Sequence, residues 1–271
     1  MAFDYQWDFE DGLTTNFARV GDGTVPTNVN GEQAHSGTRA VKCVTTTADF
    51  VAALEFRFGN AASPWLTSGI PQNPGIQPGG FWIDYWMWVS EADAAHVSEN
   101  QVDPRQWKLC LARQDIDLGG GTGAWFQHGF GEEEGSSPTF RTIRNLCDSG
   151  AISTNDYMFS AGPSGNTAFE VPGSTWWRTT YHYQRDTNQS KGRAKCWINS
   201  NLVTDTGWVI GFGTNDSAKE QSIRIGICTV EAHGQTITCY LDDIRITDTA
   251  IFPDIGGGRR RFSGPGGRHR R

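Results

Sequence analysis

The sequence predicts an all-β protein built as an antiparallel β-sandwich, with a short basic arm at its C-terminal end. The chain is rich in aromatic residues and in glycine, with 11 Trp, 15 Phe and 33 Gly, and it has only 3 Met. This composition favours strands joined by turns over helices. A length of 271 residues suits one large sandwich. We expect one domain over residues 1–254 and a tail over residues 255–271.

Alternation of apolar and polar residues is the second observation behind this fold class. Segments with this pattern, separated by turn signals, are residues 4–9, 39–44, 51–58, 81–89, 107–113, 124–130, 177–184, 193–199, 222–230 and 236–246. In one of them Trp177 and Thr179 share a face, and Arg178 and Thr180 share the other. Residues 90–100 are the one helix candidate, because they open with a Ser cap and an acidic first turn.

The charge is distributed unevenly along the chain. The tail holds six arginines and no acid: Arg259, Arg260, Arg261, Arg268, Arg270 and Arg271. Of 23 basic residues 17 then remain in the body against 30 acidic ones, a net charge of −13. Such a body disfavours nucleic-acid binding except through the tail. The tail suits an acidic partner surface, a nucleic acid or the protein's own body.

The cysteines and the first residues indicate the redox state of the chain and its site of synthesis. Six cysteines occur: Cys43, Cys110, Cys147, Cys196, Cys228 and Cys239. None forms a CxxC pair, so a zinc site is disfavoured, and we expect buried thiols in preference to disulfides. The chain starts without a secretory signal pattern and has no run of about eighteen apolar residues. We therefore expect synthesis in the cytoplasm and no membrane partner.

Several segments together resemble one known superfamily. WDFEDG (residues 7–12) resembles the first strand of carbohydrate-binding jelly rolls, HSGTRAVKC (35–43) their second, and CYLDDIRIT (239–247) their last, which pairs with the first. Residues 176–206 are similar to a hairpin of the concanavalin A-like lectin, glucanase and polysaccharide-lyase superfamily. The resemblance covers residues 4–247 and implies a jelly-roll sandwich. It does not choose among lectins, enzymes and structural members, which share the fold.

No catalytic pattern decides whether the protein is an enzyme. The retaining glucanases of this superfamily carry two carboxylates two or four residues apart on one strand, flanking the bond that is cleaved. Here the acids at residues 132–134 are consecutive in a Gly-rich segment. A polysaccharide lyase needs a cation beside the uronate and a proton acceptor. His182, Lys108 and Arg178 are the candidates, and Lys108 and His182 could face one groove. The Gln-x-His strand of alginate lyases is absent, because WFQHGF has these residues adjacent. We expect no catalysis, with a uronate lyase as the alternative.

Sugar binding needs aromatic ring faces with polar groups beside them. The candidate residues are Trp82, Trp65, Trp125 and Trp208. Trp86 and Trp88 share one face of their strand with Trp82, and we expect these two to belong to the sandwich core.

A structural calcium ion is implied by the resemblance, because similar jelly rolls hold one between the first and last strands. Asp8, Glu10, Asp242 and Asp243 match the positions that supply carboxylates there. Oxygen ligands of this kind suit Ca²⁺. The alternative is that these acids face solvent at a sheet edge.

Taken together, these features favour a non-catalytic decoration or adhesion protein of a larger assembly, such as a bacteriophage particle. The basic arm would anchor it to other subunits of the particle, and the sandwich would bind a polysaccharide on the virion surface. We also expect a homo-oligomer. The alternatives are the lyase and a free soluble carbohydrate-binding module.

Overall fold

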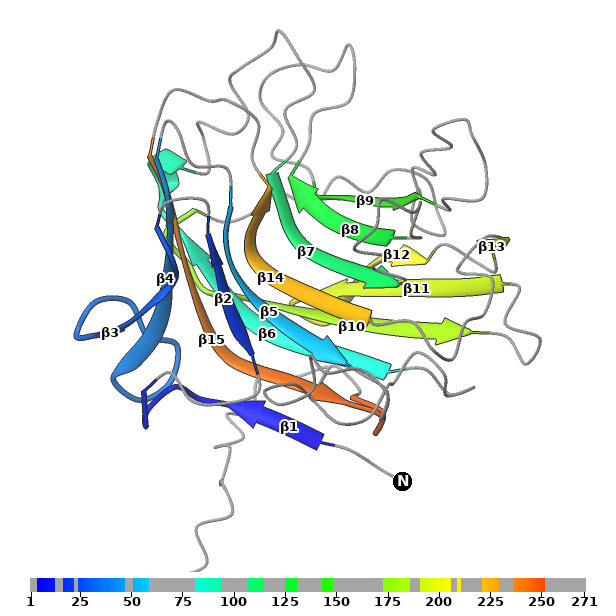
Figure 1. Ribbon diagram of the computed structural model, residues 1–271, viewed down its shortest axis with the longest axis horizontal. Helices are drawn as coiled ribbons and strands as arrows, with labels where there is room; N and C mark the ends of the chain where they lie inside the picture. The colour runs from blue at the N-terminus through cyan, green and yellow to red at the C-terminus, as the bar shows by residue number, and fades with distance from the viewer. Residues whose placement is uncertain are drawn as a thin grey trace, which may run out of the picture.

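The structure is a computed structural model that describes part of the chain. The described residues are 4–12, 17–21, 24–46, 51–58, 81–93, 107–114, 125–130, 143–148, 173–185, 191–205, 209–210, 221–229 and 236–251. They form fifteen strands in two sheets, and every strand pairing is antiparallel. The predicted all-β, antiparallel sandwich is confirmed (Figure 1).

The larger sheet has nine strands. They are β1 (Asp4–Trp7), β3 (Thr27–Asn30), β4 (Arg39–Thr45), β6 (Phe81–Val89), β10 (Trp177–Arg185), β11 (Lys191–Ile198), β12 (Asn201–Asp205), β13 (Val209–Ile210) and β15 (Ile237–Thr247). The main order is β12-β11-β10-β6-β15-β4-β3, with β1 beside β15 and β13 beside β11. The resemblance implied that the first and last strands pair, and β1 pairs with β15.

The smaller sheet has six strands in the order β2-β5-β14-β7-β8-β9. They are β2 (Ala18–Gly21), β5 (Ala52–Phe58), β7 (Trp107–Gln114), β8 (Trp125–Phe130), β9 (Ile143–Asp148) and β14 (Gln221–Thr229). Both sheets bend in the same sense, with the six-stranded sheet on the inside of the curve (Figure 1). The outer face of the nine-stranded sheet is therefore the convex side of the sandwich.

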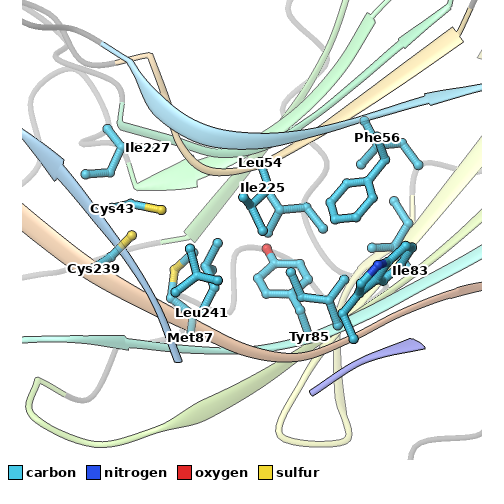
Figure 2. Close-up of a cluster of buried hydrophobic side chains, with 14 of the residues drawn as sticks. Cys43, Leu54, Phe56, Ile83, Tyr85, Met87, Ile225, Ile227, Cys239 and Leu241 are labelled. Atoms are coloured by element: carbon cyan, nitrogen blue, oxygen red, sulfur yellow. The ribbon is translucent and has the colours of Figure 1, made fainter. Parts of the chain in front are cut away.

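The core lies between the sheets and is built by alternate residues of each strand. Figure 2 shows Leu54, Phe56 and Ile225 of the six-stranded sheet facing Tyr85 and Met87 of the nine-stranded sheet. All five side chains are fully buried. Because successive side chains of a strand point to opposite faces, this core determines which residues lie outside.

Strand β15 changes its partner halfway along its length. Its first half, Ile237 to Leu241, pairs with β4, and its second half, from Ile244 on, pairs with β1. Its pairing with β6 also shifts register between Asp242 and Arg245. Asp243 takes a positive φ of 47° at this point. The irregularity resembles a β-bulge, a feature that re-aims side chains.

The structure also bears on the predicted helix, the cysteines and the membrane. Residues 91–93 form a helical turn capped by Ser90, whose hydroxyl accepts from the N–H of Asp93 at 2.9 Å. Cys43, Cys196 and Cys239 are buried thiols, as expected. In the described part of the chain no helix is long and apolar enough to cross a bilayer.

Candidate functional site: an aromatic face on the convex sheet

Aromatic side chains gather on the outer face of the nine-stranded sheet. In β6 the core takes Phe81, Ile83, Tyr85, Met87 and Val89. The intervening residues Trp82, Asp84, Trp86 and Trp88 therefore lie on the opposite face. Register adds Trp197 from β11 and Tyr240 from β15, because directly opposed residues share a face. We call Trp82, Trp86, Trp88, Trp197 and Tyr240 the aromatic face.

The expectation that Trp86 and Trp88 belong to the core is wrong. Both are partly exposed and lie on the side of β6 that faces away from the six-stranded sheet. Only one face of each strand packs into the sandwich core, and β6 has large apolar residues on both of its faces. The alternation pattern could not tell which face turns inward.

One end of the aromatic face is a stack of three rings. Trp82 and His182 lie face to face, with ring centroids 3.9 Å apart and planes 5° apart. Trp197 lies 5.5 Å from Trp82 at 24°. Trp82 is consequently only 7% exposed, whereas Trp197 and His182 are half-buried. Trp197 therefore offers a more accessible ring here than Trp82.

A second stack lies over Trp86. The imidazole of His35 lies on the Trp86 ring at 3.7 Å and 14°, and Trp176 approaches the imidazole edge-on at 5.8 Å. Nδ1 of His35 is 2.7 Å from Oδ2 of Asp243. This contact orients the ring, and the side chain of His35 remains 27% exposed.

A third aromatic contact continues the face along β15. Trp88 meets Tyr240 edge-on at 5.5 Å. The Tyr240 hydroxyl donates to Oε2 of Glu32 at 2.6 Å, and Lys42 donates to the same oxygen at 2.8 Å. Glu32 consequently has a lowered pKa, mainly through the hydrogen bonds from Lys42 and Tyr240.

Between the two stacks lies a buried ion pair. Arg178 donates from Nε and Nη2 to the carboxylate of Asp84 at 2.8–3.0 Å, and the Thr180 hydroxyl donates to Oδ1 at 2.6 Å. The Asp84 side chain is 2% exposed and that of Arg178 is 20% exposed. This pair joins β6 and β10 on the same face of the sheet, between the tryptophans.

The irregular part of β15 holds the turn before β4. Asp242 Oδ2 accepts from the N–H groups of His35 and Ser36 at 2.9 and 3.0 Å, and Asp243 Oδ1 accepts from the Ser36 hydroxyl at 2.8 Å. Burial first, and then the charge of Asp243, raise the pKa of Asp242 to about 7, although backbone N–H groups oppose this rise. These contacts position His35 over Trp86.

The four predicted calcium ligands accept hydrogen bonds from different groups. Glu10 accepts from the N–H groups of Thr38 and Arg39 at 2.9 and 2.8 Å. Partial burial raises the pKa of Glu10, and these N–H donors outweigh it, so the pKa is lowered. Asp8 accepts from the N–H of Glu10 at 3.2 Å.

In the described ranges no group of three or more His, Cys, Asp and Glu side chains is arranged to hold a metal ion. The calcium site at Asp8, Glu10, Asp242 and Asp243 stays a prediction.

The three lyase candidates lie on two strands. His182 and Arg178 lie on β10 of the nine-stranded sheet, whereas Lys108 lies on β7 of the six-stranded sheet. His182 is stacked on Trp82, and Arg178 is engaged by Asp84. The structure therefore places Arg178 and His182 on one sheet and Lys108 on the other. That Lys108 and His182 could face one groove stays a prediction.

The remaining predicted residues are only partly placed. Trp125 begins β8, in the six-stranded sheet. Trp65, Trp208 and the six tail arginines lie outside the described residues. The sequence reasoning missed His35, Trp197, Tyr240 and Trp176. The signal for Trp197 was present, because it alternates with the apolar Cys196 and Ile198.

No family model and no curated protein matches the chain. Among solved structures it is similar to alginate lyase vAL-1 from Chlorella virus, with 9% identity, a TM-score of 0.48, and coverage of 86% of this chain and 92% of that one. It is also similar to the catalytic domain of a glycoside hydrolase family 131 protein from Coprinopsis cinerea, with 14% identity, a TM-score of 0.46, and coverage of 94% and 92%. A third is Domain 4 of AbnA, a GH43 extracellular arabinanase from Geobacillus stearothermophilus, with 10% identity, a TM-score of 0.46, and coverage of 92% and 93%. Similarity at this level assigns neither a family nor an activity to the chain.

Proposed function

We propose that this protein is a non-catalytic glycan-binding sandwich and that the aromatic face is its binding surface. The proposal rests on three partly exposed tryptophans, Trp86, Trp88 and Trp197. They lie on the outer face of the nine-stranded sheet and are not part of the core. Several partly exposed aromatic rings gathered on one face are a feature of binding surfaces.

The chemistry of the face suits a sugar. The apolar side of a pyranose ring packs on an aromatic ring, while its hydroxyl groups require hydrogen-bond partners at the rim. The partly exposed Arg178 and His35 lie beside the tryptophans and supply such polar groups. Two acids near this face are paired with cations, Asp84 with Arg178 and Glu32 with Lys42. The cations offset the negative charge of these carboxylates, which would otherwise repel a uronate.

The ligand-binding site is largely pre-formed. His35 is held by Asp243, and Arg178 is held by Asp84, before any ligand arrives. Holding these groups in place reduces the conformational entropy that binding would otherwise cost. The candidate lyase residues lie on different sheets, which favours binding without catalysis.

The test is binding to a panel of neutral and uronate-containing polysaccharides, read on a glycan array and by titration calorimetry. We expect Trp197→Ala and Trp88→Ala each to weaken binding on the order of tenfold. Val25→Ala is the matched control, because Val25 is 41% exposed but lies outside the aromatic face. Wild-type silence on the whole panel, or variants that bind as the wild type does, would overturn the proposal.

The same panel also tests the alternative activity. A lyase produces an unsaturated uronate, which absorbs in the ultraviolet. A rise in absorbance on any uronate polysaccharide would replace the binding proposal with the lyase.

We further propose that the protein decorates a larger particle, such as a bacteriophage virion, through its basic arm. The support is the contrast between the six tail arginines and a body of net charge −13. Arginine forks pair with carboxylates and phosphates on a partner surface. Deletion of residues 255–271 should abolish incorporation into the particle while the sandwich stays folded. Unchanged incorporation would rule out the anchoring role.

A further inference from the structure

Two cysteines face each other across neighbouring strands in the core. Cys43 of β4 and Cys239 of β15 are direct partners in the antiparallel register. Both are 0% exposed. Figure 2 shows the two side chains next to each other, with both sulfur atoms directed into the core.

The register alone brings this pair within disulfide range. Directly opposed residues of antiparallel strands have Cα atoms about 4.5 or 5.5 Å apart. A disulfide requires about 4.4–6.8 Å between Cα atoms, so both spacings satisfy it without movement of the backbone. In the described strand registers no other two cysteines oppose one another.

A glycine leaves room beside one of the two thiols. Gly226 of β14 has a φ of +124°, and a Cβ there would lie 3.2 Å from the Cys43 sulfur and 2.9 Å from the Ala52 carbonyl oxygen. A side chain at position 226 would press on the Cys43 sulfur. The glycine therefore leaves the space beside the Cys43 sulfur free of a side chain from β14.

We propose that Cys43 and Cys239 are a modification site that forms a cross-strand disulfide when the chain folds in the presence of a low-molecular-weight disulfide. One thiolate attacks the reagent, forms a mixed disulfide and releases one small thiolate. The second cysteine thiolate attacks the mixed disulfide and releases the other small thiolate. The two cysteines lose two protons and two electrons, and the reagent is reduced to two thiols.

The bond would tie β15, which carries Tyr240 of the aromatic face, to its neighbour β4. β4 carries Lys42, and β15 carries Tyr240 and the residues that hold His35. The proposal does not depend on what that face binds. Because both thiols are buried, the reagent reaches them while the core is open, so the reaction belongs to folding.

The experiment refolds the denatured full chain in a mixture of oxidised and reduced glutathione, blocks remaining thiols with iodoacetamide, and maps peptides by mass spectrometry. Trypsin releases Cys43 on residues 43–57, but it leaves Cys228 and Cys239 together on residues 225–245. A second cleavage after Glu231 separates them. We expect the peptides of Cys43 and Cys239 to be recovered as one reductant-sensitive species. Full alkylation of both cysteines in the refolded protein would overturn the proposal.

Thermal stability gives a second readout. The oxidised protein should melt on the order of 10 °C above its reduced form, because the bond closes a long loop. Cys43→Ala should lose this shift. Cys196→Ala is the matched control, since Cys196 is also fully buried but opposes Tyr181 and Thr204, and it should keep the shift. If Cys43→Ala does not fold, the peptide map of the wild type still decides.

Discussion

The buried ion pair between Arg178 and Asp84 provides the sharpest stability prediction. Arg178→Met removes the guanidinium and keeps an apolar stem of similar length. Asp84 then stays buried, at 2% exposure, with the Thr180 hydroxyl as its remaining donor among the contacts described for it. A buried carboxylate without its cation is strongly unfavourable.

The size of the effect follows from burial. Removing one partner of a buried pair costs about 3–5 kcal/mol, whereas an exposed pair contributes about 1 kcal/mol or less. For a domain of this size the larger loss corresponds to a fall in Tm of roughly 10 °C. Replacing both partners, as in Asp84→Asn with Arg178→Met, should restore part of this loss, because the uncompensated charge is gone.

A matched control is available in the same sheet. Arg245 donates to both carboxylate oxygens of Asp4, at 2.7 and 2.8 Å, but the two side chains are 24% and 39% exposed. Arg245→Met therefore removes the same chemical group from an ion pair of similar geometry. The two pairs differ mainly in the exposure of the carboxylate. Urea denaturation at pH 7 would measure both variants. Equal losses of stability in the two variants would refute the reasoning from burial.

Two further predictions concern the turn before β4. The pKa of Asp242, at about 7, lies above the unfolded value of 3.8, so the folded state holds the proton more tightly. The stability from this group is complete below about pH 4 and is lost as pH rises toward 7, by roughly 1.4 kcal/mol per pH unit at most. Asp242→Asn should flatten that slope in urea denaturation between pH 4 and 8, and an unchanged slope would contradict the assignment. Gly37→Ala should destabilise by about 2 kcal/mol in the same assay, because φ is +63° and a Cβ would meet the Glu10 carboxylate. Gly31→Ala, with φ +75° and open space, should cost only about 1 kcal/mol; equal losses would show that the contact with Glu10 is unimportant.

Much of the fold could be predicted because alternation of side-chain character identifies strands directly. β6 was predicted with both of its ends, and most other long strands were predicted to within one or two residues. Strands β2, β3, β9, β12 and β13 are missing from the predicted segments. In β2, β3 and β13, two to four residues carry too little alternation to detect. The pairing of β1 with β15 came from the resemblance and not from the pattern.

The candidate site was predictable only in part. Trp82 was recognised, but its ring is covered by His182, and the more exposed Trp86 and Trp197 were assigned to the core or overlooked. In β6 both faces are large and apolar, so alternation shows that two faces exist without showing which one is buried. Only the approach of the six-stranded sheet decides that.

By itself, then, the sequence determined the class of fold, the places of its long strands and the separation of an acidic body from a basic arm. These properties are local or compositional, and neighbouring residues are enough to reveal them. The tertiary structure decided which residues meet across the chain: His35 with Asp243, Arg178 with Asp84, and Cys43 with Cys239. Those contacts depend on strand register and on the bulge in β15, and a shift of one residue would turn every side chain to the other face.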